Sequence, residues 1–461
     1  MSIETTMQKL VQQAIKAGAR EVECYFRRGD TLQLTQRNGS TAALSQAAET
    51  GAALRLGAGG RWVFVHCNDL TPSALQSTLE RGITLLRRVE PNGWMLPAKL
   101  APYVNLDIFD TQINTLNLEQ RVALLQRMEG YARSFSGSRD DDVRTTYEDV
   151  LEEISLANHR GQFTTYTATR FTVTIRIEPP FATMTTAGEA MRCRRFFKDL
   201  EPIELVGRRA ALQASWLQKP VSVPIGIWPV VFDPHDAGPR LFEVALGIDR
   251  SGRASLWPGA AGSPLATSGR VGMQAASSLV TVVDDATMKS GVASRPFDAE
   301  GIATNRTIVI EKGMMKTPLT SLSSTRREKE KSTGSAVRIT PGHVPKAGPS
   351  NCYLSPGTDS AADLISAVTA GLYAVRLHIL AIEPVTGRIT GHLSGRWIEG
   401  GEFTRSVTGA VFSARPEQLL KQIDGVASDL DHERFAGSAA INCPTYRIER
   451  LDLQSAAVTT T

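Results

Sequence analysis

The sequence predicts an α+β fold in which two mixed helix-and-strand modules precede a strand-rich C-terminal domain. Up to about residue 220, segments with helical periodicity alternate with segments that have strand patterns. From there to about residue 455, short strand patterns and glycine turns predominate. Stretches without periodicity separate the parts, which we place at residues 1–110, 111–220 and 221–461. A length of 461 residues suits roughly two or three domains of ordinary size.

The first module is expected to begin with an amphipathic helix and to continue with strands. Its apolar residues recur at helical spacing at Met7, Leu10, Val11, Ala14 and Ile15. Gly18 can end this helix in the left-handed conformation. Asn38 and Gly39 suit a tight hairpin turn between two strands. Thr71 and Pro72 are typical of a helix start, as N-cap and first helical residue.

The central module is expected to repeat the order of helix, strands and helix. Residues 118–135 have a helical pattern, residues 150–177 are rich in β-branched and aromatic residues, and a second helix is expected at 204–217. The third module begins with an apolar strand at residues 228–232. The stretch 91–115 contains prolines and lacks periodicity, so we interpret it as a linker.

Composition narrows the class of protein. Charged residues make up 21% of the chain and the formal net charge is +4, so nucleic acid is not expected to be the main partner. Five cysteines without a CxxC pair argue against a disulfide framework or a structural zinc site. No stretch approaches the roughly 18 uninterrupted apolar residues of a membrane helix. We therefore expect a cytoplasmic protein with reduced thiols and no membrane partner.

A set of motifs in the third module resembles the TldD/PmbA family. The motifs are residues 282–285 (VVDD), 294–301 (SRPFDAEG), 304–313 (TNRTIVIEKG), 332–336 (STGSA) and 397–401 (WIEGG). Short matches of this kind are weak singly, but their order and spacing together are specific. The family pairs a metallopeptidase subunit with a subunit that lacks the metal site. The resemblance therefore raises the question of which subunit type this chain is.

The family's catalytic subunit has the motif His-Glu-x-x-x-His, and a later cysteine completes the metal shell. The matching stretch here contains His235, Asp236 and Arg240, so the first histidine is kept, aspartate replaces glutamate and arginine replaces the second histidine. An arginine keeps its charge and cannot ligate a cation. Residues 428–433 contain no cysteine, and Cys443 is out of register with the family's ligand. This resemblance implies that the chain has no metal site and no catalytic residue of its own.

The same resemblance implies a PmbA/TldE-type subunit of a heteromeric metallopeptidase. Such a complex cleaves unfolded or leader-bearing peptides, in peptide maturation or protein degradation. The expected partner is a TldD-like metallopeptidase subunit that holds zinc, and no cofactor is expected in this chain. The two subunits would enclose a chamber that only extended chains enter. An extended peptide could be held by pairing with a sheet edge.

Some residues of the family motifs are candidate contacts to a peptide or to the partner subunit: Arg295, Asp298, Glu300 and Asn351. Paired carboxylates such as Asp298 and Glu300 could also serve acid-base chemistry or bind the amino terminus of a peptide. The motif occurs in both subunit types of the family, so we expect mainly a structural role. That role would include strand ends, turns and an ion pair between Arg295 and a carboxylate.

Two further groups of residues would indicate other functions. His235, His432 and Glu433 could form an unfamiliar metal site in a self-sufficient peptidase, although we expect them on unrelated surface loops. The basic and aromatic run at residues 192–198 could bind single-stranded nucleic acid, as in a protein that modulates a DNA-associated partner. For this run we instead expect a solvated strand or loop, or an inter-subunit contact.

Overall fold

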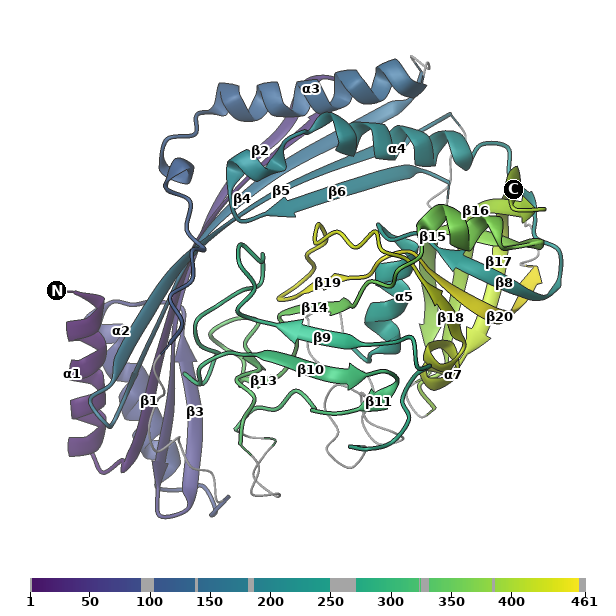
Figure 1. Cartoon of the computed structure of the whole chain (residues 1–461). Helices are drawn as coiled ribbons and strands as arrows, with labels where there is room; N and C mark the ends of the chain where they lie inside the picture. Colours follow the sequence, from purple (N-terminus) through teal and green to yellow (C-terminus); the bar gives the residue numbers. More distant parts are fainter. Residues whose placement is uncertain are drawn as a thin grey trace.

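A computed structural model of the chain describes residues 2–92, 103–136, 140–180, 186–248, 271–322, 324, 331–383 and 386–455. A long twisted sheet has helices on its outer face and a strand-rich domain against its inner face (Figure 1). The predicted α+β class and the strand-rich C-terminal part are confirmed. Residues 93–102 of the predicted linker lie outside the described part of the chain.

The long sheet is antiparallel and has the strand order β3-β2-β1-β4-β5-β6. Its strands are β1 (Glu21–Arg37), β2 (Ser40–Ala58), β3 (Arg61–Cys67), β4 (Asp142–Asn158), β5 (Phe163–Glu178) and β6 (Gly188–Arg194). The N-terminal strands join the central ones where β1 pairs with β4. The segments of the first and central modules therefore share one sheet. Asn38 and Gly39 have φ angles of 50° and 76°, which suit the predicted hairpin turn between β1 and β2.

Helices cover the outer face of the long sheet: α1 (Ile3–Lys16), α2 (Pro72–Leu86), α3 (Leu118–Ser136) and α4 (Glu204–Trp216). The first two lie over the N-terminal strands and the other two over the central strands (Figure 1). The Thr71 side chain accepts a hydrogen bond from the Ala74 N–H at the start of α2, and Pro72 occupies the first turn, as predicted. Helical periodicity thus located these elements correctly.

Alternation along β1 determines what each face of the sheet contacts. Cys24 belongs to the core beneath α1 and α2. Tyr25 packs on the opposite face, against Phe297 of the C-terminal domain. Residues two apart in a strand share a face, so Glu23 and Arg27 lie on the inner face with Tyr25. The inner face therefore brings charged side chains to the junction with the C-terminal domain.

The C-terminal domain is built on a larger and a smaller mixed sheet. The larger has the order β18-β20-β8-β15-β16-β17-β7 and closes on itself where β17 also pairs with β20. Its strands are β7 (Val221–Ser222), β8 (Gly226–Phe232), β15 (Ala370–Ile382), β16 (Ile389–Glu399), β17 (Glu402–Ala414), β18 (Ile423–Val426) and β20 (Tyr446–Ser455). The smaller sheet, in the order β11-β10-β9-β14-β19, contains β9 (Val282–Asp285), β10 (Arg306–Glu311), β11 (Met314–Met315), β14 (Asn351–Leu354) and β19 (Ala440–Asn442).

One helix connects the two sheets of this domain. Helix α5 (Ala237–Ala245) contacts β15 and β16 of the larger sheet and β19 of the smaller one. Its Leu241 and Phe242 are buried in the common core. The remaining short elements are β12 (Ala336–Val337), β13 (Lys346–Ala347), α6 (Ala361–Ser366) and α7 (Pro416–Lys421). Helix α5 therefore packs against strands of both sheets.

Buried ion pairs join the long sheet to the C-terminal domain. Arg55 of β2 binds Glu23 of β1, and its Nη1 donates to Glu300 Oε1 of the C-terminal domain at 2.7 Å. Arg338 Nη2 lies 3.4 Å from Glu23 Oε1. All of these side chains are buried. The two cations face two carboxylates, so this junction network is balanced in charge.

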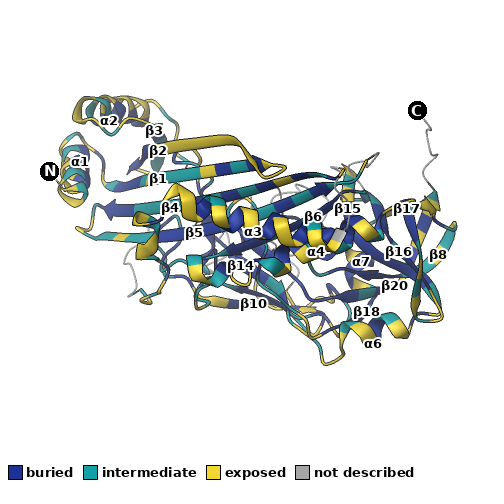
Figure 2. Cartoon of the chain, turned by 90° about the horizontal axis from the view of Figure 1, so that it is seen from above, coloured by how far each residue is buried: buried dark blue, intermediate teal, exposed yellow. Residues whose placement is uncertain are grey.

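Burial changes along β2 (Figure 2). Residues 40–49 are exposed, whereas residues 51–57 are buried. The buried part has both faces covered, since Ala52, Leu54 and Leu56 pack in the core beneath α1 and α2 and Ala53 packs in the cluster with Phe297. Strand β3 pairs only with this second part of β2, from Ala52 to Ala58. The first part therefore presents an open sheet edge, which is a ready place for another strand to pair.

Within the described residues, no helix combines the length and the apolar character that crossing a membrane would require.

Candidate functional site

The residues of the predicted motif lie in the turn between β8 and α5. Asp233 holds this turn, because its Oδ1 accepts the backbone N–H groups of His235 and Asp236 at 2.8 and 3.2 Å. The Tyr373 hydroxyl donates to Asp233 Oδ2 at 3.1 Å. Burial lowers the pKa of His235, although Asp233 opposes this shift. The imidazole is therefore held in its neutral form at neutral pH.

Asp236 lies between two guanidinium groups. Arg240 Nε donates to Asp236 Oδ1 at 2.5 Å, one turn along α5. Arg376 Nε of β15 lies 3.6 Å from Asp236 Oδ2, and Arg376 Nη2 donates to Glu189 Oε2 at 3.0 Å. Burial alone would raise the pKa of Asp236, but Arg376 and Arg240 lower it. The carboxylate is thus ionised and engaged by cations of this chain.

Glu433 lines the same cavity as His235 and Asp236, and it contacts three arginines. Arg192 Nε donates to its Oε1 at 2.7 Å, Arg194 Nη2 lies 3.2 Å from the same atom, and Arg209 Nη1 binds Oε2. Burial alone would raise the pKa of Glu433, but Arg209 and Arg192 lower it to about 2. This carboxylate, too, is neutralised by guanidinium groups.

The structure brings together two residues that the sequence did not predict to be neighbours. His235 and Glu433 line one cavity of 40 Å³, together with Glu189, Arg240 and residues of other segments. The expectation that His235, His432 and Glu433 lie on unrelated surface loops is therefore wrong for two of them. His432 instead packs edge-on against Tyr353, with ring centroids 5.1 Å apart. The described residues contain no group of three His, Cys, Asp or Glu side chains that could hold a metal ion.

Cys443 lies close to the motif but in the core. Its Sγ is 3.1 Å from the position that a Cβ on Gly238 would occupy. Burial raises the pKa of the Cys443 thiol well above its ordinary value. The thiol is therefore protonated and does not line the cavity that contains His235.

The basic run at residues 192–198 is not a solvated strand or loop, contrary to expectation. Arg192 and Arg195 are only 5% and 7% exposed. Arg195 donates to the backbone oxygens of Gly291, Thr169 and Ser294 at 2.7 to 2.9 Å. Its contacts therefore tie the end of β6 to the C-terminal domain. Burial lowers the pKa of Arg195 to about 10.

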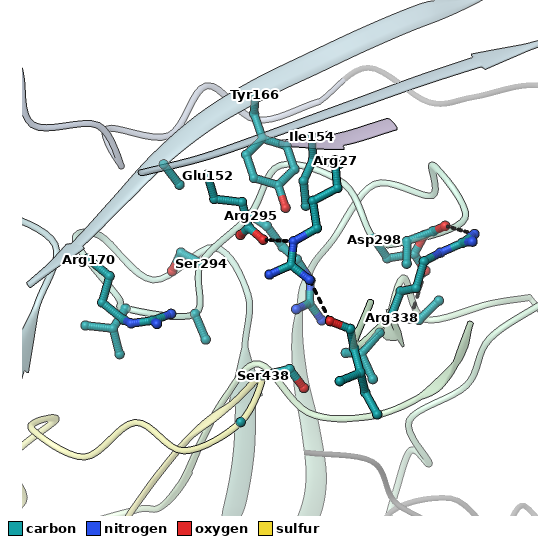
Figure 3. A pocket seen from close by; sticks show the side chains of 18 of the residues that line it. Arg27, Glu152, Ile154, Tyr166, Arg170, Ser294, Arg295, Asp298, Arg338 and Ser438 are labelled. Atoms are coloured by element: carbon teal, nitrogen blue, oxygen red, sulfur yellow. Dashed lines mark hydrogen bonds and ion pairs between the residues drawn. The ribbon is translucent and has the colours of Figure 1, made fainter. Parts of the chain in front are cut away.

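A second cavity, of 180 Å³, lies between the inner face of the long sheet and the C-terminal domain (Figure 3). We call it the junction cavity. Its charged lining residues are Arg27, Glu152, Arg170, Arg195, Arg295, Asp298 and Arg338. Arg27 Nε lies 2.7 Å from Glu152 Oε1 and its Nη1 donates to the Ile339 oxygen at 2.5 Å. Strand alternation could have predicted that arginines of the long sheet such as Arg27 lie on its inner face. It could not have predicted that Arg295 and Arg338 of the C-terminal domain lie opposite them.

Arg295 has no ion pair with any described residue, so the predicted ion pair is wrong. Its Nε and Nη2 atoms are buried and have no hydrogen-bond partner. The acid that it influences is Asp284, whose oxygens accept hydrogen bonds from Ser350 at 2.7 to 3.0 Å. Burial raises the pKa of Asp284 to about 6, while Ser350 and Arg295 oppose the shift. Arg295 thus has its charge at the junction cavity without a direct counter-charge.

The other candidate contact residues are engaged within the chain. Asp298 Oδ1 accepts the N–H groups of Glu300 and Ile302, and its Oδ2 accepts that of Ala336. Burial, followed by the charge of Glu300, raises the pKa of Asp298 to about 7. Besides its bond with Arg55, Glu300 accepts the Leu322 N–H at 2.7 Å.

Asn351 connects neighbouring loops of the C-terminal domain. Its Oδ1 accepts the Ala293 N–H at 3.0 Å, and its Nδ2 donates to the Asp285 oxygen at 2.7 Å and to Ser294 Oγ at 3.0 Å. Both the Glu300 and the Asn351 side chains are buried in this structure. Their contact with a peptide or a partner subunit stays a prediction.

Comparison of the amino-acid sequence identifies proteins that are similar to this chain. Domain profiles of the PmbA/TldA metallopeptidases match residues 22–86 (domain 1), 112–218 (central domain) and 226–455 (C-terminal domain). A metalloprotease TldD homolog of Haemophilus influenzae is 24% identical over 400 residues, which is 83% of this chain and 80% of that protein. The metalloprotease PmbA of Escherichia coli O157:H7 is 22% identical and covers 82% of this chain, with 81% of its own length matched.

Structural comparison gives the same result for the fold. The crystal structure of TldE from Thermococcus kodakarensis superposes with a TM-score of 0.84 and 18% identity, over 98% of this chain and 100% of that one. The three domain profiles match in order and together extend over most of the sequence. The chain therefore belongs to the TldD/PmbA family of metallopeptidases.

Proposed function

We propose that this chain is the non-catalytic, TldE-type subunit of a heteromeric metallopeptidase in the cytoplasm. A TldD-like partner would hold the zinc ion and the catalytic residues. The observation that supports this most directly is Arg240, which stands at the place of the second histidine ligand and is ion-paired with Asp236. The names of the relatives as metalloproteases and the likeness to TldE agree with the proposal. Five cysteines without a disulfide suit a reducing compartment.

The side chains at the motif do not fit a zinc ion. A zinc site needs at least three nitrogen, sulfur or oxygen donors with free lone pairs. His235 is one such donor, but Asp236 is engaged by Arg240 and Arg376. Glu433, which lines the same cavity, is engaged by further arginines. The guanidinium groups that engage these carboxylates would also repel a divalent cation in the cavity. We therefore assign no reaction step to this cavity.

The chain would act by shaping the space in which the partner cleaves peptides. An unfolded or leader-bearing peptide enters as an extended strand, and a sheet edge can bind it through backbone groups alone. Residues 40–49 of β2 provide an exposed edge of this kind, for the peptide or for a strand of the partner. This role needs no catalytic residue in the present chain.

Separate and joint purification tests the proposal. The chain and a TldD-like protein of the same cell are produced singly and together, and zinc is measured in each subunit. We expect cleavage of an unfolded protein only when both are present, and stoichiometric zinc in the partner alone. Zinc bound by this chain, with chelator-sensitive cleavage in the absence of any partner, would instead establish a self-sufficient peptidase.

A substitution at the motif gives a sharper test. In the assembled complex, His235→Ala is expected to leave the cleavage rate within about twofold and the zinc content unchanged, because the imidazole binds no reacting atom. Loss of the first histidine of the partner's own motif serves as the control and should abolish both zinc and activity. A large loss of activity from His235→Ala, with the complex still assembled, would refute the non-catalytic role.

A further inference from the structure

We propose that the junction cavity binds a carboxylate group of a peptide. The inference rests on the proposed function in one respect, namely that the peptide is the substrate of the complex. The cavity itself is separate from the motif at His235, since it opens between the loops 292–299, 336–339 and 435–438 and the inner face of β1, β4 and β5. Its volume of 180 Å³ is equivalent to about six water molecules at about 30 Å³ each, enough for a small acid.

The charges that line the junction cavity do not balance. Five arginines and two carboxyl groups surround it. Two of the arginines have their counter-charge outside the lining, since Arg170 Nη2 lies 3.4 Å from Glu148 Oε1 and Arg338 Nη2 lies 3.4 Å from Glu23 Oε1. One carboxyl group, that of Glu152, is paired with Arg27, and the other, that of Asp298, accepts backbone N–H groups only. Arg195 has only backbone oxygens as hydrogen-bond partners, and Arg295 has none among the described residues. Buried cations without a counter-charge are costly, and an anion in the cavity would remove this cost.

The unsatisfied donors have the geometry that a carboxylate needs. The Nε–H and Nη2–H groups of a guanidinium point the same way and form the fork that binds both oxygens of a carboxylate. In Arg295 both of these atoms are buried and without a partner. Arg338 is only 8% exposed, and its Nε and Nη1 atoms are also without a hydrogen bond. Figure 3 shows Arg295 beside the pair of Arg27 and Glu152, with Arg338 across the cavity.

The surroundings favour a peptide over a free ion. Tyr25, Ile154 and Tyr166 add an apolar wall, which suits the carbon atoms next to a carboxylate rather than a fully hydrated ion. A neighbouring cavity of 270 Å³ shares Arg170 and Phe435 with the junction cavity. That neighbour in turn shares Met191 with the cavity at His235. The three cavities thus follow the inner face of the sheet in sequence, as the binding track of an extended chain would.

Fluorescence anisotropy with the purified full chain tests the proposal. The probes are an alanine hexapeptide with an uncharged BODIPY fluorophore at its N-terminus and a free C-terminal carboxylate, its C-terminal amide, and an amide that contains one glutamate. We expect at least one acid-bearing peptide to bind about tenfold or more tightly than the plain amide, as hydrogen bonds to a charged group imply. The free carboxylate and the glutamate peptide distinguish a chain terminus from a side chain as the bound group.

Arg295 variants show whether the cavity causes this preference. Arg295→Met should abolish the preference, and Arg295→Lys, which keeps the charge but not the fork, should retain a small part of it. Arg306→Met, at an exposed arginine outside the cavity, is the matched control and should bind like the parent chain. In the absence of peptide, Arg295→Met should raise the thermal unfolding midpoint, whereas removal of an arginine that only stabilises the fold would lower it.

Equal binding of acid and amide peptides, or a preference that survives in Arg295→Met, would overturn the proposal. The proposal would also be overturned if inorganic phosphate bound to the chain in an Arg295-dependent way while none of the acid-bearing peptides bound. The binding is measured on this chain alone, so its failure is distinguishable from failure of the proposed function. The latter would appear as zinc in this chain or as a lack of assembly with the TldD-like partner.

Discussion

Single residues around α5 form ion pairs with one another at the motif. Asp236 and Glu433 line the cavity together with His235, and each is neutralised by arginines of this chain. The motif alone predicts that Arg240 is not a ligand, and this stays a prediction. It could not reveal that Arg376 completes the pairing of Asp236, because β15 is distant in the sequence and only the fold brings it near.

Glu433 allows a prediction about stability and pH. At pH 7, Glu433→Gln is expected to lower the free energy of unfolding by about 3 kcal/mol, because buried guanidinium groups lose their counter-charge. The pKa in the folded state, about 2, is below the ordinary value of 4.5. The stabilisation is therefore complete above about pH 4.5 and is lost as the pH falls toward 2. Urea unfolding of both proteins at several pH values measures the difference.

The matched control for this substitution is Glu402→Gln, at an exposed glutamate at the start of β17. It should change stability by no more than about 0.5 kcal/mol at any of these pH values. If both substitutions had the same effect, or if the Glu433→Gln difference persisted at pH 2, the buried ion pairs would not be the cause.

At the scale of elements, glycines determine how closely α4 packs against its neighbours. A Cβ on Gly207 of α4 would lie 2.3 Å from the Met128 oxygen of α3, and one on Gly188 of β6 would lie 2.1 Å from the Ala210 oxygen of α4. Periodicity predicted α3 and α4, since each has a repeating apolar face. Periodicity could not predict the close approach of the two helices, because a glycine in the sequence does not indicate which backbone segment will pack against it.

Gly207→Ala is expected to lower the free energy of unfolding by about 1 to 3 kcal/mol, because the added methyl forces α3 and α4 apart. Gly130→Ala on α3 is the matched control, since a Cβ there meets nothing within 4 Å. The control should raise stability by up to about 1 kcal/mol through better helix propensity. Thermal unfolding of the two variants compares them directly, and a stabilised Gly207→Ala protein would disprove the close contact.

At the scale of the whole molecule, one sheet and one ionic network make the modules a single structure. The sequence predicted strands on both sides of the linker, but not that β1 pairs with β4, because strand pairing over long separations leaves no local pattern. The junction cavity could likewise not be predicted from the sequence. Arg27 could be placed on a strand face from alternation, whereas its neighbours Arg295 and Arg338 come from loops without periodicity.

The junction network gives the corresponding prediction. Glu300→Gln is expected to lower the free energy of unfolding by about 3 kcal/mol, because Arg55 and Arg338 are then balanced by Glu23 alone. The Glu300 side chain is fully buried, so 1 M salt should hardly change the difference, although it screens surface pairs. Glu178→Gln, whose partner Arg176 is partly exposed, is the control and should have a small, salt-sensitive effect. Urea unfolding followed by tryptophan fluorescence and circular dichroism measures both.

If the network couples the modules, the long sheet and the C-terminal domain unfold together in the parent chain and in separate steps in Glu300→Gln. Separate steps already present in the parent chain would show that the ion pairs do not join the modules.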